Sequence, residues 1–480
     1  MRQMFYKPAN GWVGDIIPFF KDGEYKLFYI HDFRNNPPCD GSLPWYLLGT
    51  KNFVDFTEYG EAIPCGNKTE QDAWVCTGSV IEADGLYHIF YTGMMNVPEH
   101  MPQAVMHAVS KDFVNWRKHP EDTFFADTSL YEKFDWRDPF VFYNDEEKCW
   151  NMLVTAKCKS GLDSRTGCIA LLKSRDLRKW ENKGPFYYPG CYAALECPDL
   201  FKIGEWWYLV FSTFNGRTCT RYRMSKSLNG PWFQPAVDTF DTRAFYAAKT
   251  ASDGKRRFIF GWNPPRGAEG NESDDEPWNW AGNIVVHEIK QNPDGTLRVS
   301  MPDEIFREMD SEKAIRCRPA AGKWTCYEGK YSGDAGESYA CILSEEPMAD
   351  NCMITADFSF SSDSTALGML IRTDNSLKKG YLLSVRPKKS RITFGKFPEA
   401  WCEPHPFSME RTAEIKENQS HTLKVLIRES IAAFYLDDQA ALSVRMFQYK
   451  DGLLGFFAEN GKVVFSNIKQ YKFIDNGEIL

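Results

Sequence analysis

Three carboxylates lie in apolar, aromatic-rich segments, where a charge is costly unless it has a task. They are Asp15, Asp138 and Glu196, and each has Trp, Tyr or Phe within a few residues. Burying a carboxylate costs several kcal/mol unless it is paired, hydrogen-bonded or protonated. Two such groups about 5 Å apart would suit retaining glycoside hydrolysis, one as nucleophile and the other as general acid and then base.

The aromatic neighbours strengthen this interpretation, because they supply stacking faces for sugar rings and raise the pKa of an acid by desolvation. Taken singly, an acid in an apolar run is more often a turn residue, an N-cap or an ion-pair partner, and Arg137 next to Asp138 would form such a pair. The three acids together, one in each of three repeats at matching positions, favour catalysis. The eight His have no metal-ligand spacing, so we expect neither a metal nor any other cofactor.

The elements that position these acids are indicated by a repeat in the first 300 residues. A turn followed by an aromatic-rich strand recurs five times, roughly 50 to 60 residues apart. Its copies begin at Asp22, Asp84, Glu147, Gly204 and Asp253.

A second element keeps its order between these strands. It is a polar turn closed by an aromatic residue, with copies starting at Thr50, Ser110, Ser174 and Ser225. Two interleaved repeats with one period predict a five-bladed β-propeller over residues 1–300. Because the equivalent strand of every blade lines the central channel, the three acids are expected to converge at one mouth.

The repeat ends near residue 300, and the remaining chain has a different character. We expect a linker over 301–317, with a short helix at Pro302–Met309, and then a β-sandwich over 318–480, where short alternating runs are separated by turns. The acidic run Glu272–Glu276 is predicted to be a solvated loop. The fold class is therefore all-β, in line with an aromatic content of 15%.

Charge and hydropathy exclude several kinds of partner. The net charge is −8 and no Lys/Arg block occurs, so we expect no nucleic-acid partner. There is no apolar leader and no run of about 18 apolar residues, which predicts a cytoplasmic protein without a membrane partner. The 14 Cys are scattered without a C-x-x-C pair and are expected to be reduced. The sequence leaves a homodimer open.

At the acidic residues the chain resembles glycoside hydrolase family 32, the invertase, fructanase and sucrose-6-phosphate hydrolase family. Gly11–Asp15 is similar to the family's G-W-M-N-D motif, while Trp136–Pro139 contains its R-D-P and Glu196–Asp199 is its E-C-P-D. Weaker similarities are found at Cys76–Ser79, Phe245–Ala248, Gly261–Trp262 and Trp280–Gly282. The resemblance covers the whole chain, because the family combines a five-bladed propeller with a C-terminal β-sandwich.

The resemblance implies roles for the acids. Asp15 would attack the anomeric C2 of a β-fructofuranosyl unit, and Glu196 would protonate the leaving oxygen and then activate water. Asp138, with Arg137, would hold sugar hydroxyls and stabilise the transition state. Further binding residues expected to line the fructosyl pocket are Trp12, His31, Asp32, Trp45, Trp74, Thr77, Tyr246 and Trp262.

Besides Ile16, which stands where the family has Pro after the nucleophile, two departures from the family pattern bear on the pocket. Gly14 stands where the family has Asn before the nucleophile, and Ile30 stands where it has Gln. Either His31 and Asp32 take over the lost contacts or the pocket is reshaped.

The leading hypothesis is a retaining glycoside hydrolase that releases fructose from short β-fructofuranosides, such as inulobiose, small fructo-oligosaccharides or sucrose. A small carbohydrate is thus the expected partner. Because of the two departures, a fructosyltransferase or a hydrolase of another furanoside is the alternative. A sugar-binding protein with decayed catalysis is a third, which the three intact acids oppose.

Overall fold

The computed structural model describes residues 1–34, 42–95, 102–398 and 409–473. The chain forms two compact β units. The first consists of residues 1–239, 245–262 and 280–297, and the second of 240–244, 263–279 and 298–480. The second unit therefore also includes two segments from within the range predicted for the propeller.

Helical structure is short in the described part of the chain. It consists of α1 (Asp303–Arg307) and the 3-10 turns η1 (Pro120–Asp122) and η2 (Pro387–Lys389). Within these described ranges, no helix has the length and hydrophobicity needed to cross a membrane.

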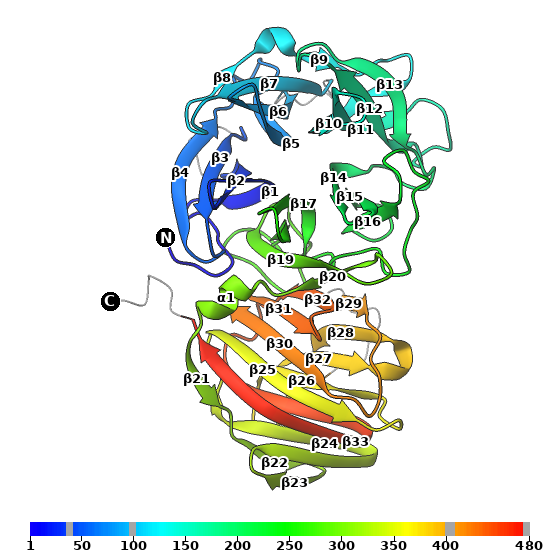
Figure 1. Cartoon of the computed structure of the whole chain (residues 1–480). Helices are drawn as coiled ribbons and strands as arrows, with labels where there is room; N and C mark the ends of the chain where they lie inside the picture. The colour runs from blue at the N-terminus through cyan, green and yellow to red at the C-terminus, as the bar shows by residue number, and fades with distance from the viewer. Residues whose placement is uncertain (35–41, 96–101, 399–408, 474–480) are drawn as a thin grey trace. The chain divides into compact units, whose positions relative to one another are not determined.

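Five antiparallel sheets surround a common axis, so the predicted five-bladed propeller is confirmed (Figure 1). The strands follow chain order, except that β9 of the second blade pairs with β7, and the first strand of each sheet is the innermost. The first blade contains β1 (Trp12–Lys21), β2 (Glu24–Asp32), β3 (Trp45–Thr50) and β4 (Phe56–Ile63). The second contains β5 (Trp74–Ala83), β6 (Leu86–Met94), β7 (Ala104–Ser110), β8 (Arg117–Lys118) and β9 (Phe124–Phe125).

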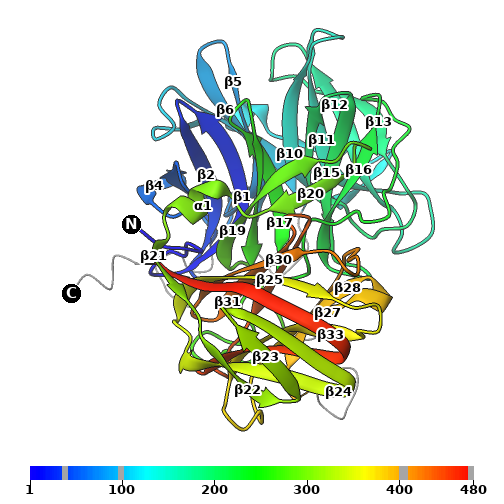
Figure 2. The same ribbon diagram turned by 60° about the horizontal axis from the view of Figure 1, so that its bottom comes forward.

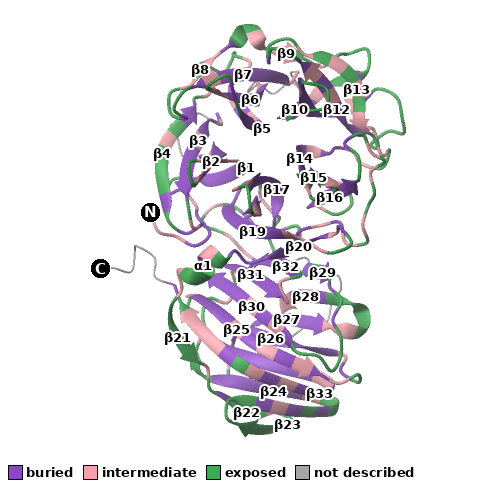
Figure 3. Cartoon of the chain, viewed as in Figure 1, coloured by how far each residue is buried: buried purple, intermediate pink, exposed green. Residues whose placement is uncertain are grey.

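The other three blades have the same arrangement. The third contains β10 (Tyr131–Asn144), β11 (Cys149–Cys158), β12 (Gly167–Ser174) and β13 (Glu181–Tyr187). The fourth contains β14 (Glu196–Ile203), β15 (Trp206–Thr213) and β16 (Cys219–Ser225). The fifth contains β17 (Tyr246–Ser252), β18 (Arg257–Asn263), β19 (Asn283–Gln291) and β20 (Leu297–Ser300). Figure 3 shows that β1, β5 and β17 are largely buried, whereas β4 has many exposed residues.

The first sequence repeat corresponds to a turn of every blade, and the second repeat to a turn of the first four blades. The aromatic strand is the second strand of the sheet, and the hairpin before it has positive φ at Asp22 (52°) and Gly23 (78°), as a type I′ turn requires. The polar turn follows the third strand, where the Asp112 carboxylate accepts hydrogen bonds from the backbone of Val114 (3.0 Å) and Asn115 (2.8 Å). These local bonds explain why the same residue types recur from blade to blade.

The N-terminal segment closes the ring of blades. Val13 of β1 exchanges backbone hydrogen bonds with Gly282 at 3.0 and 2.9 Å, and the backbone of Ile284 in β19 donates to Tyr6 at 2.9 Å. These bonds join the start of the chain to the segment that leads into β19 of the fifth blade. The ring therefore holds the innermost strands at fixed positions around the axis.

The second unit is the predicted β-sandwich, built as one continuous sheet of 13 strands. Its continuity comes from two long strands, β24 (18 residues) and β33 (20 residues), which pair along most of their length with several register shifts (Figure 2). Buried apolar side chains such as Ile354, Met369 and Phe434 (each 0% exposed) fill its core. The strands are β21 (Asp310–Ala314), β22 (Cys317–Ala321), β23 (Lys323–Tyr327), β24 (Lys330–Pro347), β25 (Asn351–Phe360), β26 (Ala366–Thr373), β27 (Tyr381–Arg386), β28 (Arg391–Lys396), β29 (Met409–Thr412), β30 (His421–Arg428), β31 (Ile431–Leu436), β32 (Ala440–Arg445) and β33 (Leu453–Lys472).

The acidic run Glu272–Glu276 is only partly the solvated loop that the sequence predicts. Asp274 is 1% exposed and belongs to the second unit. Its carboxylate accepts hydrogen bonds from the Tyr381 hydroxyl (2.7 Å) and the Phe447 backbone (2.8 Å). The prediction was wrong for Asp274, because its hydrogen-bond partners lie more than a hundred residues away in the sequence.

Candidate active site

Each innermost strand of the propeller has a β-bulge at the same level. The pairing register shifts in all five of them, and three bulges open with a residue of positive φ. A bulge inserts extra residues into a strand and re-aims their side chains. The residues skipped by the pairing are Gly14–Asp15, Thr77, Asp138–Pro139, Cys197–Pro198 and Ala247–Ala248.

The three acids lie at these bulges, but the prediction that they occupy matching positions was wrong. Glu196 immediately precedes its bulge, Asp138 is the first residue of its own, and Asp15 is the second. In register, Cys197 is therefore the equivalent of Asp138. The acids approach the axis from three successive strand positions.

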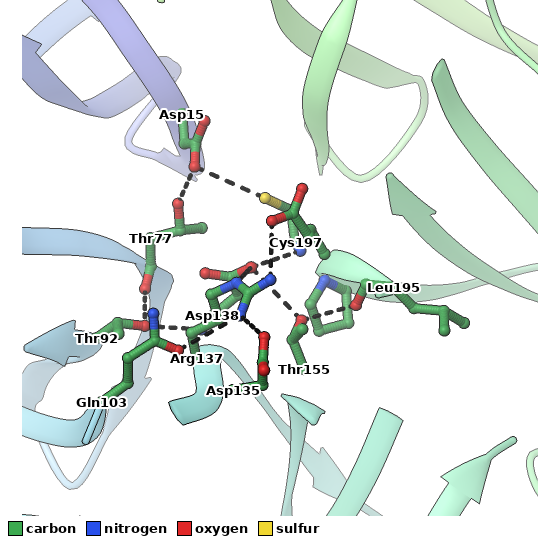
Figure 4. Close-up of polar contacts among 12 residues, drawn as sticks. Asp15, Thr77, Thr92, Gln103, Asp135, Arg137, Asp138, Thr155, Leu195 and Cys197 are labelled. Carbon is green, nitrogen blue, oxygen red and sulfur yellow. Dashed lines mark hydrogen bonds and ion pairs between the residues drawn. The ribbon is translucent and has the colours of Figure 1, made fainter. Parts of the chain in front are cut away.

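Asp15 is held at both carboxylate oxygens by groups from other blades. The Trp262 indole donates to Oδ1 at 2.9 Å. Oδ2 accepts from the Thr77 hydroxyl and from the Cys197 thiol, whose Sγ lies 3.8 Å away (Figure 4). Burial raises the pKa of Asp15, the bonds from Thr77 and Trp262 oppose that rise, and the charge of Glu196 adds to it. The carboxylate is thus fixed in orientation and electrostatically coupled to Glu196.

Glu196 is also held at both oxygens. Arg137 Nη2 donates to Oε1 at 3.0 Å, and the Tyr246 hydroxyl donates to Oε2 at 2.7 Å. The Tyr246 ring lies 5.5 Å from the Trp262 ring, which in turn is bonded to Asp15. Because 21% of its side-chain surface is exposed, Glu196 remains accessible to water or to a ligand.

Asp138 is the most deeply buried of the three acids, at 4% exposure. Its Oδ2 accepts a hydrogen bond from the backbone of Cys197 at 2.9 Å, and its own backbone donates to the Thr92 hydroxyl at 2.7 Å. Burial is the main cause that raises the pKa of Asp138 to about 6, and Arg137 opposes the rise. The carboxyl group of Asp138 is thus held in place, and its ionisation costs free energy in the folded state.

Replacing Asp138 with Asn is expected to stabilise the protein at pH 8. Because the folded pKa of about 6 exceeds the ordinary 3.8, the folded state binds the proton more tightly, and stability is lost as pH rises through this window. The difference corresponds to about 3 kcal/mol, of which we expect Asn to recover about 1–3. Calorimetric unfolding at pH 8 and pH 4 measures this, with little change expected at pH 4.

Asp135→Asn is the matched control for this prediction. Burial raises the pKa of Asp135, but the ion pairs with Arg137 (2.8 Å) and Lys157 (3.0 Å) outweigh it and lower the pKa overall. The ionised Asp135 therefore stabilises the fold at pH 8, and replacing it with Asn should lower the free energy of unfolding. A lower melting temperature for both variants at pH 8 would contradict the account of Asp138.

Arg137 connects the carboxylates rather than pairing with one of them. It binds Asp135 at 2.8 Å and Glu196 at 3.0 Å, while its Nε lies 3.9 Å from Asp138 (Figure 4). Gln103 accepts a further bond at 3.4 Å. The sequence suggested a structural pair between Arg137 and Asp138, but this is the longest of the three ion pairs. The guanidinium therefore balances several negative charges at once.

The family with the description "Glycosyl hydrolases family 32 N-terminal domain" has a sequence profile that matches residues 5–297. The chain belongs to glycoside hydrolase family 32. The resemblance noted in the sequence is therefore confirmed, and the protein is a glycoside hydrolase.

Known family 32 proteins match this chain over most of its length. A raffinose invertase from Escherichia coli is 24% identical, with 96% of this chain and 92% of that protein covered. A sucrose-6-phosphate hydrolase from Zymomonas mobilis is 23% identical, with coverages of 98% and 91%. The crystal structure of an exo-inulinase from Aspergillus awamori has the same fold, at a TM-score of 0.73, 17% identity and coverages of 99% and 98%.

Of the binding residues predicted for this family 32 chain, Thr77, Tyr246 and Trp262 contact the acids directly, as described above. Trp12 is 5% exposed, and its ring has the Lys7 ammonium at 4.3 Å and the Arg34 guanidinium at 5.0 Å.

Four further predicted binding residues are Asp32, Trp74, Trp45 and His31. Asp32 forms an ion pair with Arg34 at 3.1 Å, and Trp74 is half-buried on β5. Trp45 is fully buried, and its indole donates to the Cys76 carbonyl at 3.1 Å. His31 is 2% exposed and stacks on Phe33, with ring centroids 3.9 Å apart. Burial lowers the pKa of His31, so it packs as a neutral ring.

Sequence reasoning missed several residues that position the acids. Thr92, Gln103, Asp135, Thr155 and Cys197 all bond to Asp138, Arg137 or Asp15 (Figure 4). Only Cys197 carried a signal, since it lies inside the E-C-P-D motif. Across the described part of the chain, no group of three or more His, Cys, Asp or Glu side chains is arranged to hold a metal ion.

Proposed function

We propose that this family 32 hydrolase is a retaining β-fructofuranosidase that releases fructose from short fructosides. Inulobiose, small fructo-oligosaccharides and sucrose are the proposed substrates. The observation that carries the proposal is the pair of carboxyls, Asp15 and Glu196, which come from different blades and face the same aromatic pair, Tyr246 and Trp262. The invertase and the sucrose-6-phosphate hydrolase among its relatives support the same substrate class.

In the first step Asp15 is the nucleophile. One of its oxygens forms a bond to C2 of the fructosyl unit as the bond from C2 to the leaving oxygen breaks. Glu196 transfers its proton to that oxygen, so the leaving sugar departs as a neutral alcohol. The hydrogen bonds from Thr77 and Trp262 favour the ionised form of Asp15 that this attack requires.

In the second step Glu196 acts as the base. It takes a proton from water while the water oxygen bonds to C2, and the ester bond to Asp15 breaks. Asp15 and Glu196 return to their starting states. Two inversions at C2 give overall retention of configuration.

Asp138 is proposed to stabilise the positive charge that develops on the fructosyl ring, and Arg137 is proposed to help it hold the sugar hydroxyls. This role needs an ionised Asp138, whose pKa is about 6 because of its burial. We therefore expect kcat/KM to fall as pH drops through about 6, since protonation removes the charge. A pH profile of kcat/KM measures this, and full activity well below pH 5 would contradict it.

Reaction in the presence of methanol tests the proposed stereochemistry. Methanol competes with water for the fructosyl-enzyme and gives a methyl fructofuranoside that does not mutarotate. The proposal expects the β-anomer by proton NMR, as retention requires. The α-anomer, or no turnover of any fructoside, would overturn the proposal.

A hydrolase of another furanoside is the second candidate. Gly14 and Ile30, at positions where the family motif has Asn and Gln, favour it. A panel of chromogenic β-fructofuranosides and α-arabinofuranosides with product analysis separates the two, and fructosyl transfer would appear as longer products at high substrate concentration.

A further inference from the structure

A cavity of about 260 Å³ lies between the second and third blades, at the outer rim of the propeller (Figure 1). One wall is formed by η1 and β9, and the other by β12, β13 and the turn that joins them. Protein sites for small molecules begin at a volume of about 300 Å³. The cavity is therefore close in size to a site for a small ligand such as a short sugar.

The cavity is separate from the site of the three acids. Trp136 of β10 lines the cavity, whereas Arg137, the next residue, bonds to Glu196 at 3.0 Å. Successive side chains of a strand point to opposite faces of the sheet. Trp136 accordingly packs in the apolar core between the two blades, with its ring centroid 5.4 Å from that of Tyr131. A ligand in the cavity would thus leave the active site open.

Two aromatic side chains give the cavity faces on which a ligand can stack. Phe125 of β9 is 50% exposed, although large apolar side chains are usually buried. Trp180, in the turn after β12, is half-buried, and its ring is held by an edge contact with Phe90, with centroids 5.5 Å apart. Both Phe125 and Trp180 line the cavity. Aromatic faces of this kind receive the C–H groups of a sugar ring.

The indole nitrogen of Trp180 is free to bond a ligand. In the matching turn of the second blade, the Trp116 indole donates to the Phe113 carbonyl at 2.6 Å. Over the ranges that the structure describes, the Trp180 indole has no hydrogen-bond partner, and solvent reaches its nitrogen. Trp136 and Thr123 also line the cavity, and in the same ranges their indole nitrogen and hydroxyl are buried without a partner. Unpaired polar groups cost free energy, which a ligand rich in hydroxyl groups would recover.

The charged groups around the cavity favour a neutral ligand. Among the described residues that line it are three carboxylates, from Glu121, Asp122 and Asp127, and one guanidinium, from Arg178. This balance of charge would repel an anion such as phosphate. Arg178 is exposed, and no ion pair engages it in the part of the chain that the structure describes. Carboxylates and a free guanidinium together can accept from and donate to the hydroxyl groups of a sugar.

We propose that this cavity is a second carbohydrate-binding site, which holds a neutral mono- or oligosaccharide apart from the three acids. The sugar ring stacks on Phe125 and Trp180, and its hydroxyls bond to the Trp180 indole, to Arg178 and to Asp127. The site binds sugar without cleaving it. The inference goes beyond the proposed function and does not depend on it.

Fluorine NMR of the Asp15→Asn protein labelled with 5-fluorotryptophan tests this site, since the variant binds fructosides without consuming them. The Trp180 signal is identified by its absence from Trp180→Phe. We expect inulobiose to shift it saturably, with a Kd on the order of 1 mM. Adding Phe125→Ser should weaken that Kd by about tenfold, because it removes a stacking face. Phe233→Ser, the same change at an aromatic side chain of 54% exposure beside β16, is the control and should leave the Kd unchanged.

Activity and stability separate binding at the rim from an effect on the active site. In the protein that keeps Asp15, Phe125→Ser should leave kcat and KM for sucrose and the melting temperature close to wild type. A Trp180 signal that does not respond saturably to inulobiose, or a Kd that Phe125→Ser leaves unchanged, would overturn the inference. Saturation by inorganic phosphate without a response to inulobiose would also overturn it, since the cavity would then be an anion site. Turnover of fructosides by the wild-type protein tests the proposed function separately.

Discussion

Replacing Asp15 with Asn is expected to lower kcat on fructosides by a factor on the order of 10⁵. Asn is nearly isosteric and its carbonyl oxygen can still accept the Trp262 hydrogen bond, which in the wild type is 2.9 Å long. The amide cannot attack C2, however, so no covalent intermediate forms. The loss should therefore appear in kcat, while substrate binding and the melting temperature stay close to wild type.

Asp145→Asn is the matched control, because Asp145 is an exposed carboxylate in the hairpin between β10 and β11. It should retain full activity. An Asp15→Asn variant that keeps more than about a hundredth of wild-type kcat in a preparation free of wild-type enzyme would exclude Asp15 as the nucleophile.

Glu196→Gln is expected to lower kcat on inulobiose or sucrose by about 10³-fold, the usual contribution of a general acid and base. The glutamine can keep the local geometry, since its oxygen accepts from Arg137 while its amide faces the Tyr246 hydroxyl, which can rotate to accept. Only proton transfer is lost. The first step should therefore depend on the leaving group, with p-nitrophenyl β-fructofuranoside reacting much faster than a disaccharide.

Azide tests the second half of this role. With the activated substrate, Glu196→Gln lacks a base for water, so the fructosyl-enzyme should accumulate until azide, which needs no deprotonation, releases β-fructofuranosyl azide. Accelerated turnover with azide is the expected result. Equal losses on activated and natural substrates without azide rescue would remove Glu196 from the acid and base role.

Repeats made the propeller predictable from sequence. The turn before each second strand and the polar turn after each third strand are local structures, stabilised by bonds between residues two or three apart, such as Asp112 to Asn115. Such patterns can be read from sequence alone. The convergence of Asp15, Asp138 and Glu196 followed from the same repeat, because equivalent strands of a propeller share one axis.

The details of the site could not be predicted in the same way. A β-bulge is a property of the pairing between two strands, so the offset of Asp138 from Glu196 becomes visible only in the register. The sequence likewise does not show which of the aromatic residues reach the acids. Trp45 on β3 fills a blade core, whereas Trp262 on β18 reaches Asp15.

Long-range packing accounts for the remaining surprises. Trp280 covers Gly14 from the far end of the propeller sequence, and nothing near Gly14 in the chain indicates it. His31 lies directly beside Ile30, yet its ring packs in an aromatic cluster with Phe33 and with Tyr46 of the neighbouring strand β3.

The most direct measurement of the central claim is the identity of the residue that carries the fructosyl group. Glu196→Gln is mixed with p-nitrophenyl β-fructofuranoside, quenched in acid within its first turnovers and digested for peptide mass spectrometry. The account predicts a peptide containing Asp15 that is heavier by one fructosyl unit, with the label lost after azide treatment. A label on another residue, or stoichiometric product release without any labelled peptide, would contradict it.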